Sequence, residues 1–599
     1  MTVFKEKVRK FKTNINLLRT LRLIWSITNG RVVWMLLLIV VESLLFFGSL
    51  YIFKLLINEV SHPDKNNGRE NIIGYLVVAA SLSAFYLVIK AITSFITEKQ
   101  SAKVSEYIDN RLHASAIDLD LGFYESPAYF DTMKRAKDAG PDKPNAILTN
   151  LVDIAKNGMM LLVMGSVLVS ISWLLLPLLA VFIFPTLLVR VKYAGKYYQW
   201  RRVQTPLERK SAYLSSLITE EVTAKEIRAF NIGNHLRSLY MDIRNGLVVQ
   251  RLKMARRNTL NEIITTIMAA LGMFACIGYI CVSTVNGNTT VGDISLFLVV
   301  FPQLFNIMQA LSSGISILYH NSIFMNNVFE MFDMKSEFPE PEHPMMVPED
   351  HVDLEVKTVD FTYSHVKGKT LSGIDLKIPA GKIIAIVGLN GAGKTTLIKL
   401  LSRLYDPSGG AITLGGIDIR KFKSADYRKQ ISVVFQDFAK YNMSVKDNIR
   451  FGDIDGKESD EKIKIAAIKS GAHDFIKKFP AGYETIMGRT FEDGHEVSIG
   501  QWQKLAIARA FYSNSRFLIF DEATSALDAK AEQELFESLR ELIGNRGILV
   551  ISHRLSAVKH ADHIYVMAEG KIKQHGTHEE LIAAPGEYSK LFSKKTVVI

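Results

Sequence analysis

Cysteine is nearly absent from this sequence of 599 residues. The only two cysteines, Cys276 and Cys281, lie in the same apolar stretch. This scarcity argues against a disulfide scaffold and against a zinc site built from cysteine thiolates. We interpret both residues as small apolar side chains that fill space in a core.

Charged residues are scarce in six stretches that reach about 20 mostly apolar residues, the length needed to cross the hydrocarbon layer of a membrane. The predicted spans are 32–53, 72–96, 155–173, 174–191, 260–283 and 294–318. Apolar residues make up 48% of the chain although its net charge is +12. This combination is typical of a membrane protein with basic cytoplasmic faces. We therefore expect a lipid bilayer as a partner and no nucleic acid.

Six spans place both ends of the chain on the same side of the membrane. The segments 1–31, 97–150 and 192–258 are rich in Lys and Arg, whereas the opposite loops 58–71, 173–177 and 284–292 carry few of them. The positive-inside rule then predicts that both termini are cytoplasmic. A cleaved signal peptide is not expected, because the first apolar run is of full span length and further spans follow.

The two long basic segments 97–150 and 192–258 are rich in Glu, Lys, Arg, Ala and Leu at helical spacing. We predict that they are helices that continue the spans into the cytoplasm. Each contains an aromatic cluster that could dock on another part of the protein, FYESPAYF at 123–130 and IRAFNIG at 227–233. The alternative is a solvated charged helix that has no partner.

A proline-rich acidic stretch divides the chain into two parts. Residues 335–350, KSEFPEPEHPMMVPED, hold four prolines and several acids, a composition typical of a linker. After it, short β-type runs alternate with helical runs, which indicates an α/β fold. We therefore predict an α-helical transmembrane domain over 1–334, a linker over 335–350 and an α/β domain over 351–599.

A phosphate-binding loop is indicated by GLNGAGKT at 388–395, which follows the β-type run KIIAIV and precedes a helical run. This order is what the GxxxxGK[ST] motif of P-loop NTPases requires. The glycines let backbone N–H groups face phosphate oxygens, Lys394 adds a positive charge, and the Thr395 hydroxyl is placed for Mg²⁺. The predicted nucleotide contacts of this loop are Gly388, Leu389, Asn390, Gly391, Ala392, Gly393, Lys394, Thr395 and Thr396.

Two carboxylates end a second buried strand, FLIFDE at 517–522. Asp521 fits a partner of Mg²⁺. Glu522 would then lie near the γ-phosphate, where it could orient or deprotonate an attacking water. The alternative is an acid pair that caps a helix beginning at Ala523. A phosphate loop earlier in the chain favours the catalytic interpretation.

Further motifs follow in a fixed order. They are FTY (361–363), ISVVFQDF (431–438), FEDGHE (491–496), VSIGQ (497–501), SALD (525–528) and ISHRL (551–555). With six predicted spans ahead of them, the chain resembles a type IV, B-family half-exporter of the ATP-binding cassette (ABC) transporters over nearly its whole length. The resemblance implies an ATPase that uses ATP and Mg²⁺ and lies in a cell membrane, such as a bacterial plasma membrane.

The resemblance also implies roles for single residues around the chain's own nucleotide. Tyr363 would stack on adenine, and His553 would contact the γ-phosphate. Gln436 would lie near Mg²⁺ and the attacking water, with Thr395 and Asp521 as the other residues around the metal. The catalytic group would thus be Glu522, His553 and Gln436.

Other motif residues would act on a partner. In the family, two cassettes meet head to tail, and each ATP lies between the phosphate loop of one chain and the signature of the other. Ser498, Gly500 and Gln501 would meet the partner's ATP, and Asp528 would face the partner's site. Closure of the dimer on ATP and its opening after hydrolysis would drive alternating access in the spans. A homodimer is favoured because every motif apart from the signature is intact, and a heterodimer is the alternative.

The signature stretch VSIGQ lacks the first of the two glycines in the family pattern LSGGQ, because Ile499 stands in its place. A β-branched residue adopts a positive φ with difficulty and adds bulk near the nucleotide. The substitution would act on the partner's ATP. In a homodimer we expect slow but real ATPase, whereas in a heterodimer the site that faces Ile499 would be the weaker one.

The cargo is less well defined by the sequence. Glu42 lies inside the first span, where a charge costs roughly 2.5–3.5 kcal/mol. It could contact a cationic group on the cargo or make a structural hydrogen bond within the bundle. Other charged residues near span ends, Lys54, Lys90, Glu262 and Asp293, are expected to extend to the membrane surface.

Two local strings, VVFQDFAKYNMSVKDNI (433–449) and DGHEVSIGQWQKLAIAR (493–509), resemble exporters of lanthipeptides such as nisin. A modified peptide or another amphipathic compound is therefore the expected cargo, and leader removal would need another protein because no peptidase domain precedes the spans. The alternatives are a lipid or multidrug exporter and, from another class, an ATP-binding membrane regulator or immunity protein without transport. An importer is disfavoured by the layout of the chain.

Overall fold

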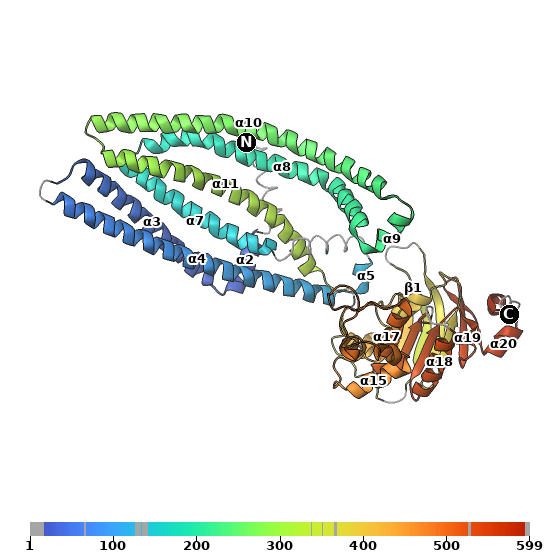
Figure 1. Ribbon diagram of the computed structural model, residues 1–599. Helices are drawn as coiled ribbons and strands as arrows, with labels where there is room; N and C mark the ends of the chain where they lie inside the picture. Colours follow the sequence, from blue (N-terminus) through green and yellow to red (C-terminus); the bar gives the residue numbers. More distant parts are fainter. Residues whose placement is uncertain are drawn as a thin grey trace. The chain divides into compact units, whose positions relative to one another are not determined.

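The computed structural model describes residues 17–64, 67–125, 133, 142–336, 338, 340–349, 352–363, 368–524 and 529–592 (Figure 1). The chain divides into two compact units. The first unit comprises Met1–Asp118 and Phe130–Met334, and the second comprises Leu119–Tyr129 and Lys335–Ile599. Each unit is described by itself below.

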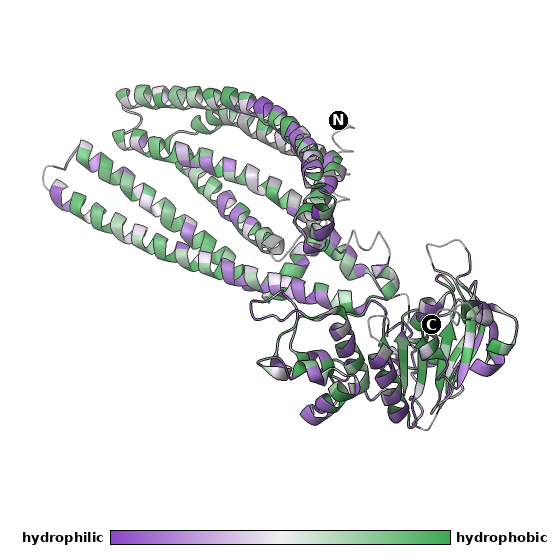
Figure 2. Cartoon of the chain, turned by 45° about the vertical axis from the view of Figure 1, so that its right-hand side comes forward, coloured by the Kyte–Doolittle hydropathy of each residue, from purple (hydrophilic) through white to green (hydrophobic). Residues whose placement is uncertain are grey.

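The first unit is built from long helices, and hydrophobic residues cover much of their length (Figure 2). Its helices are α2 (Leu17–Thr28), α3 (Arg31–Ser61), α4 (Gly68–Asp118), α7 (Asp142–Ile171), α8 (Leu175–Thr219), α9 (Glu221–Ala229), α10 (Gly233–Val285) and α11 (Val291–Asp333). At 1.5 Å per residue, α4 is about 75 Å long, more than twice the roughly 30 Å thickness of the hydrocarbon layer.

Five helical segments of the described residues are long and apolar enough to cross a membrane, by length and composition. They are Arg31–Ser61, Gly68–Asp118, Ala146–Ile171, Gly233–Val285 and Val291–Ile315. They contain all or most of five of the six predicted spans. The remaining prediction, 174–191, falls almost entirely within α8, in which several side chains lie outside the described residues.

The predicted helical continuation of the spans is confirmed for the described parts of both basic segments. The stretch 97–118 belongs to α4, and the stretch 192–219 belongs to α8. Glu220 interrupts the second segment with an extended backbone (ψ 145°), so that the short helix α9 is separate from α8. Of the predicted aromatic cluster at 123–130, residues 126–130 lie outside the described residues.

Helices α3 and α11 are joined by ionic and hydrogen-bond contacts near the C-terminal end of α3. Lys54 Nζ lies 2.6 Å from Asp293 Oδ1, and the Gly292 N–H donates to Asn58 Oδ1 at 2.8 Å. Asp293 also completes a capping box with Thr290 at the start of α11. The expectation that Lys54 and Asp293 extend separately to the membrane surface was wrong, because the two charges neutralise each other between the helices.

The second unit contains two sheets. The first has the order β2-β1-β4-β5 and is antiparallel, and the second has the order β10-β9-β3-β8-β7-β6 and is parallel except for the β9–β10 pair. The strands are β1 (Leu354–Phe361), β2 (Leu371–Ile378), β3 (Ile383–Val387), β4 (Gly409–Leu414), β5 (Ile417–Asp418), β6 (Ile431–Val434), β7 (Phe517–Asp521), β8 (Gly547–Ile551), β9 (His563–Ala568) and β10 (Lys571–Gly576).

The second unit also contains helices. They are α5 (Leu121–Tyr124), α12 (Lys394–Leu401), α13 (Ser424–Arg428), α14 (Val445–Arg450), α15 (Asp460–Lys469), α16 (His473–Ile476), α17 (Ile499–Tyr512), α18 (Ala529–Leu542), α19 (Leu555–Val558), α20 (His578–Ala583) and α21 (Glu587–Phe592). Two short 3₁₀ turns cover Ile419–Lys421 and Gly482–Glu484. Every residue of β3, β7 and β8 is buried, as expected for parallel strands covered on both faces.

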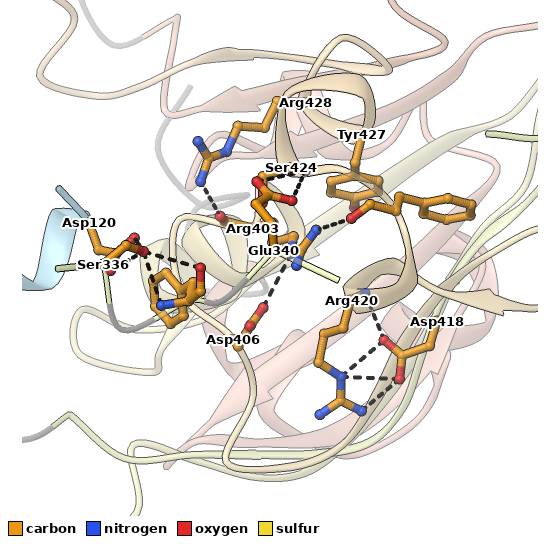
Figure 3. A network of polar contacts seen from close by, with 12 residues as sticks. Asp120, Ser336, Glu340, Arg403, Asp406, Asp418, Arg420, Ser424, Tyr427 and Arg428 are labelled. Atoms are coloured by element: carbon orange, nitrogen blue, oxygen red, sulfur yellow. Dashed lines mark hydrogen bonds and ion pairs between the residues drawn. The ribbon is translucent and has the colours of Figure 1, made fainter. Parts of the chain in front are cut away.

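The proline-rich stretch is anchored to the second unit at several points. Glu340 accepts hydrogen bonds from the backbone N–H of Ser424 at 3.0 and 3.2 Å, at the start of α13 (Figure 3). The Met345 N–H donates to the carbonyl of Lys421 at 2.9 Å. In its described part, the predicted linker therefore follows the surface of this unit rather than forming a free spacer.

Candidate nucleotide site

The loop 388–393 leaves the buried strand β3 and enters α12. Gly391 and Gly393 have φ of 81° and 97°, a backbone region that strains other residues. A Cβ added to Gly393 would lie 2.5 Å from Leu371 Cδ2, and one added to Gly388 would collide with the carbonyl oxygen of Met567. Glycine is therefore required both for the turn and for the close approach of neighbouring strands.

Lys394 is the first residue of α12, and its side chain turns back over the loop. Its Nζ donates to the carbonyls of Gly388 at 2.8 Å and Leu389 at 3.2 Å, and lies 3.1 Å from His553 Nε2. Burial lowers the pKa of Lys394, although the carboxylates of Glu522 and Asp521 act in the opposite direction. The ammonium group is thus held at the mouth of the loop, with hydrogen bonds that a phosphate oxygen could replace.

Glu522 is the centre of a polar cluster beside this ammonium group. One carboxylate oxygen lies 3.0 Å from His553 Nε2, and the other accepts a hydrogen bond from Gln436 Nε2 at 3.0 Å. The backbone φ of Glu522 is 50°, which is uncommon for a residue with a side chain. Such strain is frequently found at functional sites.

The sheet explains why these residues meet. Gln436 follows β6, Glu522 follows β7 and His553 follows β8, whereas the phosphate loop follows β3. These strands run parallel, so their C-terminal ends share one edge of the sheet. This edge is where open α/β sheets bind their ligands.

Asp521 is buried beside this cluster, with 1% of its surface exposed. Burial raises the pKa of its carboxyl to about 6, opposed by a hydrogen bond from Thr395 and reinforced by Glu522. Its Oδ2 has no hydrogen-bond partner among the described residues. A buried carboxylate oxygen next to a threonine hydroxyl is a donor set that suits a hard cation such as Mg²⁺.

Tyr363 follows β1 and contacts the start of α12. Its hydroxyl lies 3.2 Å from Thr396 Oγ1, and its ring meets Phe361 and Tyr405 edge-on, with centroids 4.8 and 5.4 Å apart. The structure therefore brings the predicted adenine contact next to the predicted phosphate loop. Leu389, Asn390, Gly391 and Ala392 of that loop also line a cavity of about 600 Å³ together with β10 and the stretch 585–587.

The signature stretch begins α17. Ser498 is the N-cap and forms a capping box with Gln501, in which the Gln501 N–H donates to Ser498 Oγ at 3.3 Å and the Ser498 N–H donates to Gln501 Oε1 at 3.0 Å. Ile499 is the first helical residue, its φ is not positive, and its side chain is 62% exposed. The expected backbone strain at Ile499 is therefore absent. Asp528 lies outside the described residues.

Glu42 in the first unit is fully buried and paired. Its Oε1 lies 2.5 Å from Lys156 Nζ, which belongs to α7. Sequence reasoning had not singled out Lys156. The sequence contained a signal for this pair. Lys156 is a lone cation near the start of one predicted span, and Glu42 is a lone anion inside another. The pair favours the structural role for Glu42 over contact with cargo.

Comparison with known proteins agrees with this geometry. Residues 371–525 match the sequence family described as ABC transporter, and residues 32–308 match the ABC transporter transmembrane region. The chain belongs to the ABC transporter family, and it is a multi-pass membrane protein with an ATP-binding domain. The predicted fold class, helical transmembrane domain plus α/β nucleotide-binding domain, is confirmed.

Among its relatives, the chain is 30% identical to the subtilin transport ATP-binding protein of Bacillus subtilis, over 96% of this chain and 93% of the relative. It is 29% identical to the nisin transport ATP-binding protein of Lactococcus lactis, over 97% and 96%. It is also 31% identical to an ATP-dependent lipid A-core flippase of Syntrophus aciditrophicus, over 80% and 79%. A solved bacterial Atm1-family ABC exporter with ATP bound shares its fold, with a TM-score of 0.79, 22% identity, and coverage of 95% of this chain and 99% of that one.

Proposed function

We propose that the chain is one half of a dimeric exporter that couples ATP hydrolysis to transport across a cell membrane. The observation that carries this proposal is the cluster of Glu522, His553 and Gln436 beside Lys394, with 3.0–3.1 Å between neighbouring side chains. A regulator that only binds ATP has no need of a carboxylate held between a histidine and a glutamine at the end of the phosphate loop.

The cluster can divide the work of hydrolysis among its members. Lys394 and the backbone N–H groups of the loop hold the phosphates, and His553 contacts the γ-phosphate. Glu522, oriented by Gln436, accepts a proton from water as the water oxygen bonds to the γ-phosphorus, and the bond to the bridging oxygen of ADP breaks. Thr395 and Asp521, with Gln436 nearby, would hold Mg²⁺, which neutralises negative charge on the phosphates when bound.

The proposed assembly places both termini and the ATP-binding domain in the cytoplasm of the cell. Two chains meet head to tail, so that Ser498, Gly500 and Gln501 of one chain face the ATP of the other, as does Asp528. A homodimer is supported by the intact cluster around Glu522, because each chain then supplies a complete catalytic edge.

The proposed cargo is a modified peptide or another amphipathic compound. Similarity over nearly the full length to the subtilin and nisin transport proteins supports a peptide. The second candidate is a lipid, and the similar identity to lipid A-core flippases favours it over other cargo. Accumulation of a fluorescently labelled lanthipeptide or lipid in inside-out vesicles distinguishes the two.

The central test is Glu522→Gln in the full chain reconstituted in lipid. We expect this variant to bind ATP and to lose at least about a hundredfold in ATPase rate, because the proton acceptor is gone. ATP-dependent accumulation of cargo in vesicles is expected to fall in parallel. An ATPase rate near that of the unmodified chain would remove Glu522 as the general base.

A further inference from the structure

Tyr405 connects three parts of the second unit that are distant in sequence. It follows α12 and is 9% exposed. Its ring meets Tyr363 edge-on at 5.4 Å and Phe361 at 5.5 Å between centroids. On another side it meets Phe338 of the proline-rich stretch at 6.4 Å. The position of the Tyr405 ring therefore helps to set the position of the Tyr363 ring.

Glu125 fixes this aromatic cluster from outside. Its two carboxylate oxygens accept hydrogen bonds from different donors, Lys399 Nζ at 2.5 Å and the Tyr405 hydroxyl at 2.6 Å. Burial raises the pKa of Tyr405, and the hydrogen bond to Glu125 raises it further. Burial would lower the pKa of Lys399, but Glu125 and Tyr363 together outweigh this effect, so its pKa is raised. Both donors are therefore held in the protonated form that Glu125 requires.

Lys399 extends the contact to Tyr363 itself. Its ammonium group lies 5.6 Å from the centroid of the Tyr363 ring and 5.9 Å from that of Tyr405, within range for cation–π attraction. Thr396, one turn earlier on α12, contacts the Tyr363 hydroxyl at 3.2 Å. Tyr363 is thus held at its hydroxyl by Thr396 and at its ring by Phe361, Lys399 and Tyr405. Glu125 bonds to the last two of these ring contacts.

We infer that Glu125 is a positioning residue for the base of the nucleotide, because it holds Lys399 and Tyr405 against Tyr363. The inference rests on the proposed function, in which Tyr363 stacks on adenine. Glu125 lies only seven positions after Asp118, the last residue of α4.

The experiment compares ATP with tripolyphosphate, which carries phosphates but no base, on the full chain reconstituted in lipid. For Glu125→Ala we expect the KM for ATP to rise about threefold to tenfold. The loss is partial because Tyr363 keeps its contacts with Thr396 and Phe361. The kcat should stay within about twofold, and the inhibition constant of tripolyphosphate should not change. Tyr405→Phe, which deletes only the hydroxyl donor, should raise the KM in the same direction and covers the case in which Glu125→Ala fails to fold.

The matched control is Asp120→Asn in the same segment. The Asp120 carboxylate accepts hydrogen bonds from the Ser336 hydroxyl at 2.8 Å, a different donor from Lys399 and Tyr405, which bond to Glu125 (Figure 3). The inference is overturned if Glu125→Ala weakens the binding of ATP and of tripolyphosphate equally. It is also overturned if Asp120→Asn raises the KM for ATP as Glu125→Ala does, because the segment would then have no specific effect on the base. An unchanged KM in both Glu125→Ala and Tyr405→Phe also overturns it.

A parallel Tyr363→Ala variant separates this inference from the proposed function. A higher KM for ATP in Tyr363→Ala together with an unchanged KM in Glu125→Ala overturns the role of Glu125 alone. An unchanged KM in Tyr363→Ala overturns the adenine contact and, with it, the role of Glu125. In the Tyr363→Ala background, Glu125→Ala should change the KM by less than about twofold, because the two residues act through one contact.

Discussion

Ile499 occupies the first turn of α17 with a helical backbone and an exposed side chain. In the proposed dimer, its effect on the partner's nucleotide would therefore be one of bulk and not of backbone strain. Because the capping box of Ser498 and Gln501 is formed despite the isoleucine, the local fold of the signature does not need a glycine at this position.

We expect Ile499→Gly to raise the ATPase rate of the isolated chain by roughly threefold to tenfold, which corresponds to about 0.7–1.4 kcal/mol in the barrier. The reason is that the partner's nucleotide would approach α17 more closely. Ile499→Ala is the control, because it removes most of the bulk and keeps a good helix former. An unchanged rate in both variants would make the isoleucine a tolerated replacement and weaken the case for two unequal sites.

Asp521 makes stability depend on pH in the absence of nucleotide and Mg²⁺. Its pKa is raised by burial to about 6 in the folded chain, against 3.8 for the free group. The folded state thus binds the proton more tightly, and its contribution to stability falls as pH rises from about 4 to about 6, by about 2 to 3 kcal/mol. Thermal unfolding should show this loss, and Asp521→Asn should remove that part of the slope. A slope of the same size in both proteins would contradict the assignment.

At the residue scale, the motifs of the ATP-binding edge were predictable from sequence, because each follows a buried strand and needs particular side chains at fixed spacing. The helical backbone of Ile499 was not predictable, because the family pattern suggested that this position needs a glycine, and the helix does not. The ring contacts of Tyr405 were also missed, since Glu125, Phe338 and Tyr363 meet there from separate parts of the sequence.

Helices α3 and α7 are joined by the Glu42–Lys156 pair. Glu42 has no exposed surface, so removing Lys156 leaves a buried charge without compensation, a change that commonly costs 3–5 kcal/mol. Replacing both residues by neutral ones of similar shape removes the burial cost together with the attraction.

We therefore expect Lys156→Met to lower the thermal stability of the purified protein more than the double variant Glu42→Gln with Lys156→Met. Cargo-stimulated ATPase should survive in the double variant if the pair is structural. Loss of cargo stimulation with normal stability and basal ATPase would instead support contact between Glu42 and cargo. Glu262→Gln on α10 provides a comparison at another charged position of the first unit.

At the element scale, the long helices followed from apolar runs and helical spacing. The pairing of these helices could not be predicted in the same way. Glu42 and Lys156 lie on different helices, and hydrophobic periodicity does not indicate which helix faces meet. The same holds for Lys54 and Asp293, which looked like independent charges at span ends and proved to be one ion pair.

For the whole molecule, the proposed homodimer gives a direct expectation. The chain purified alone in lipid nanodiscs should have twice the mass of one chain. Glu522→Gln with ATP should strengthen the association of its ATP-binding domains, because bound ATP favours the closed state by its differential affinity. Mass measurement and cross-linking check both points. A monomer that lacks ATPase until a second, different half-transporter is added would identify a heterodimer.

The contact between α3 and α11 has a consequence for motion. Asp293 makes two sets of bonds. Its bonds to Thr290 form the capping box of α11, and its ion pair with Lys54 joins α11 to α3. Separation of the two helices would break the second set of bonds and leave the first intact. The capping box would then keep the first turn of α11 formed, and the two helices could separate without unwinding. The contribution of the ion pair to the resistance against parting weakens as ionic strength rises wherever water reaches the pair.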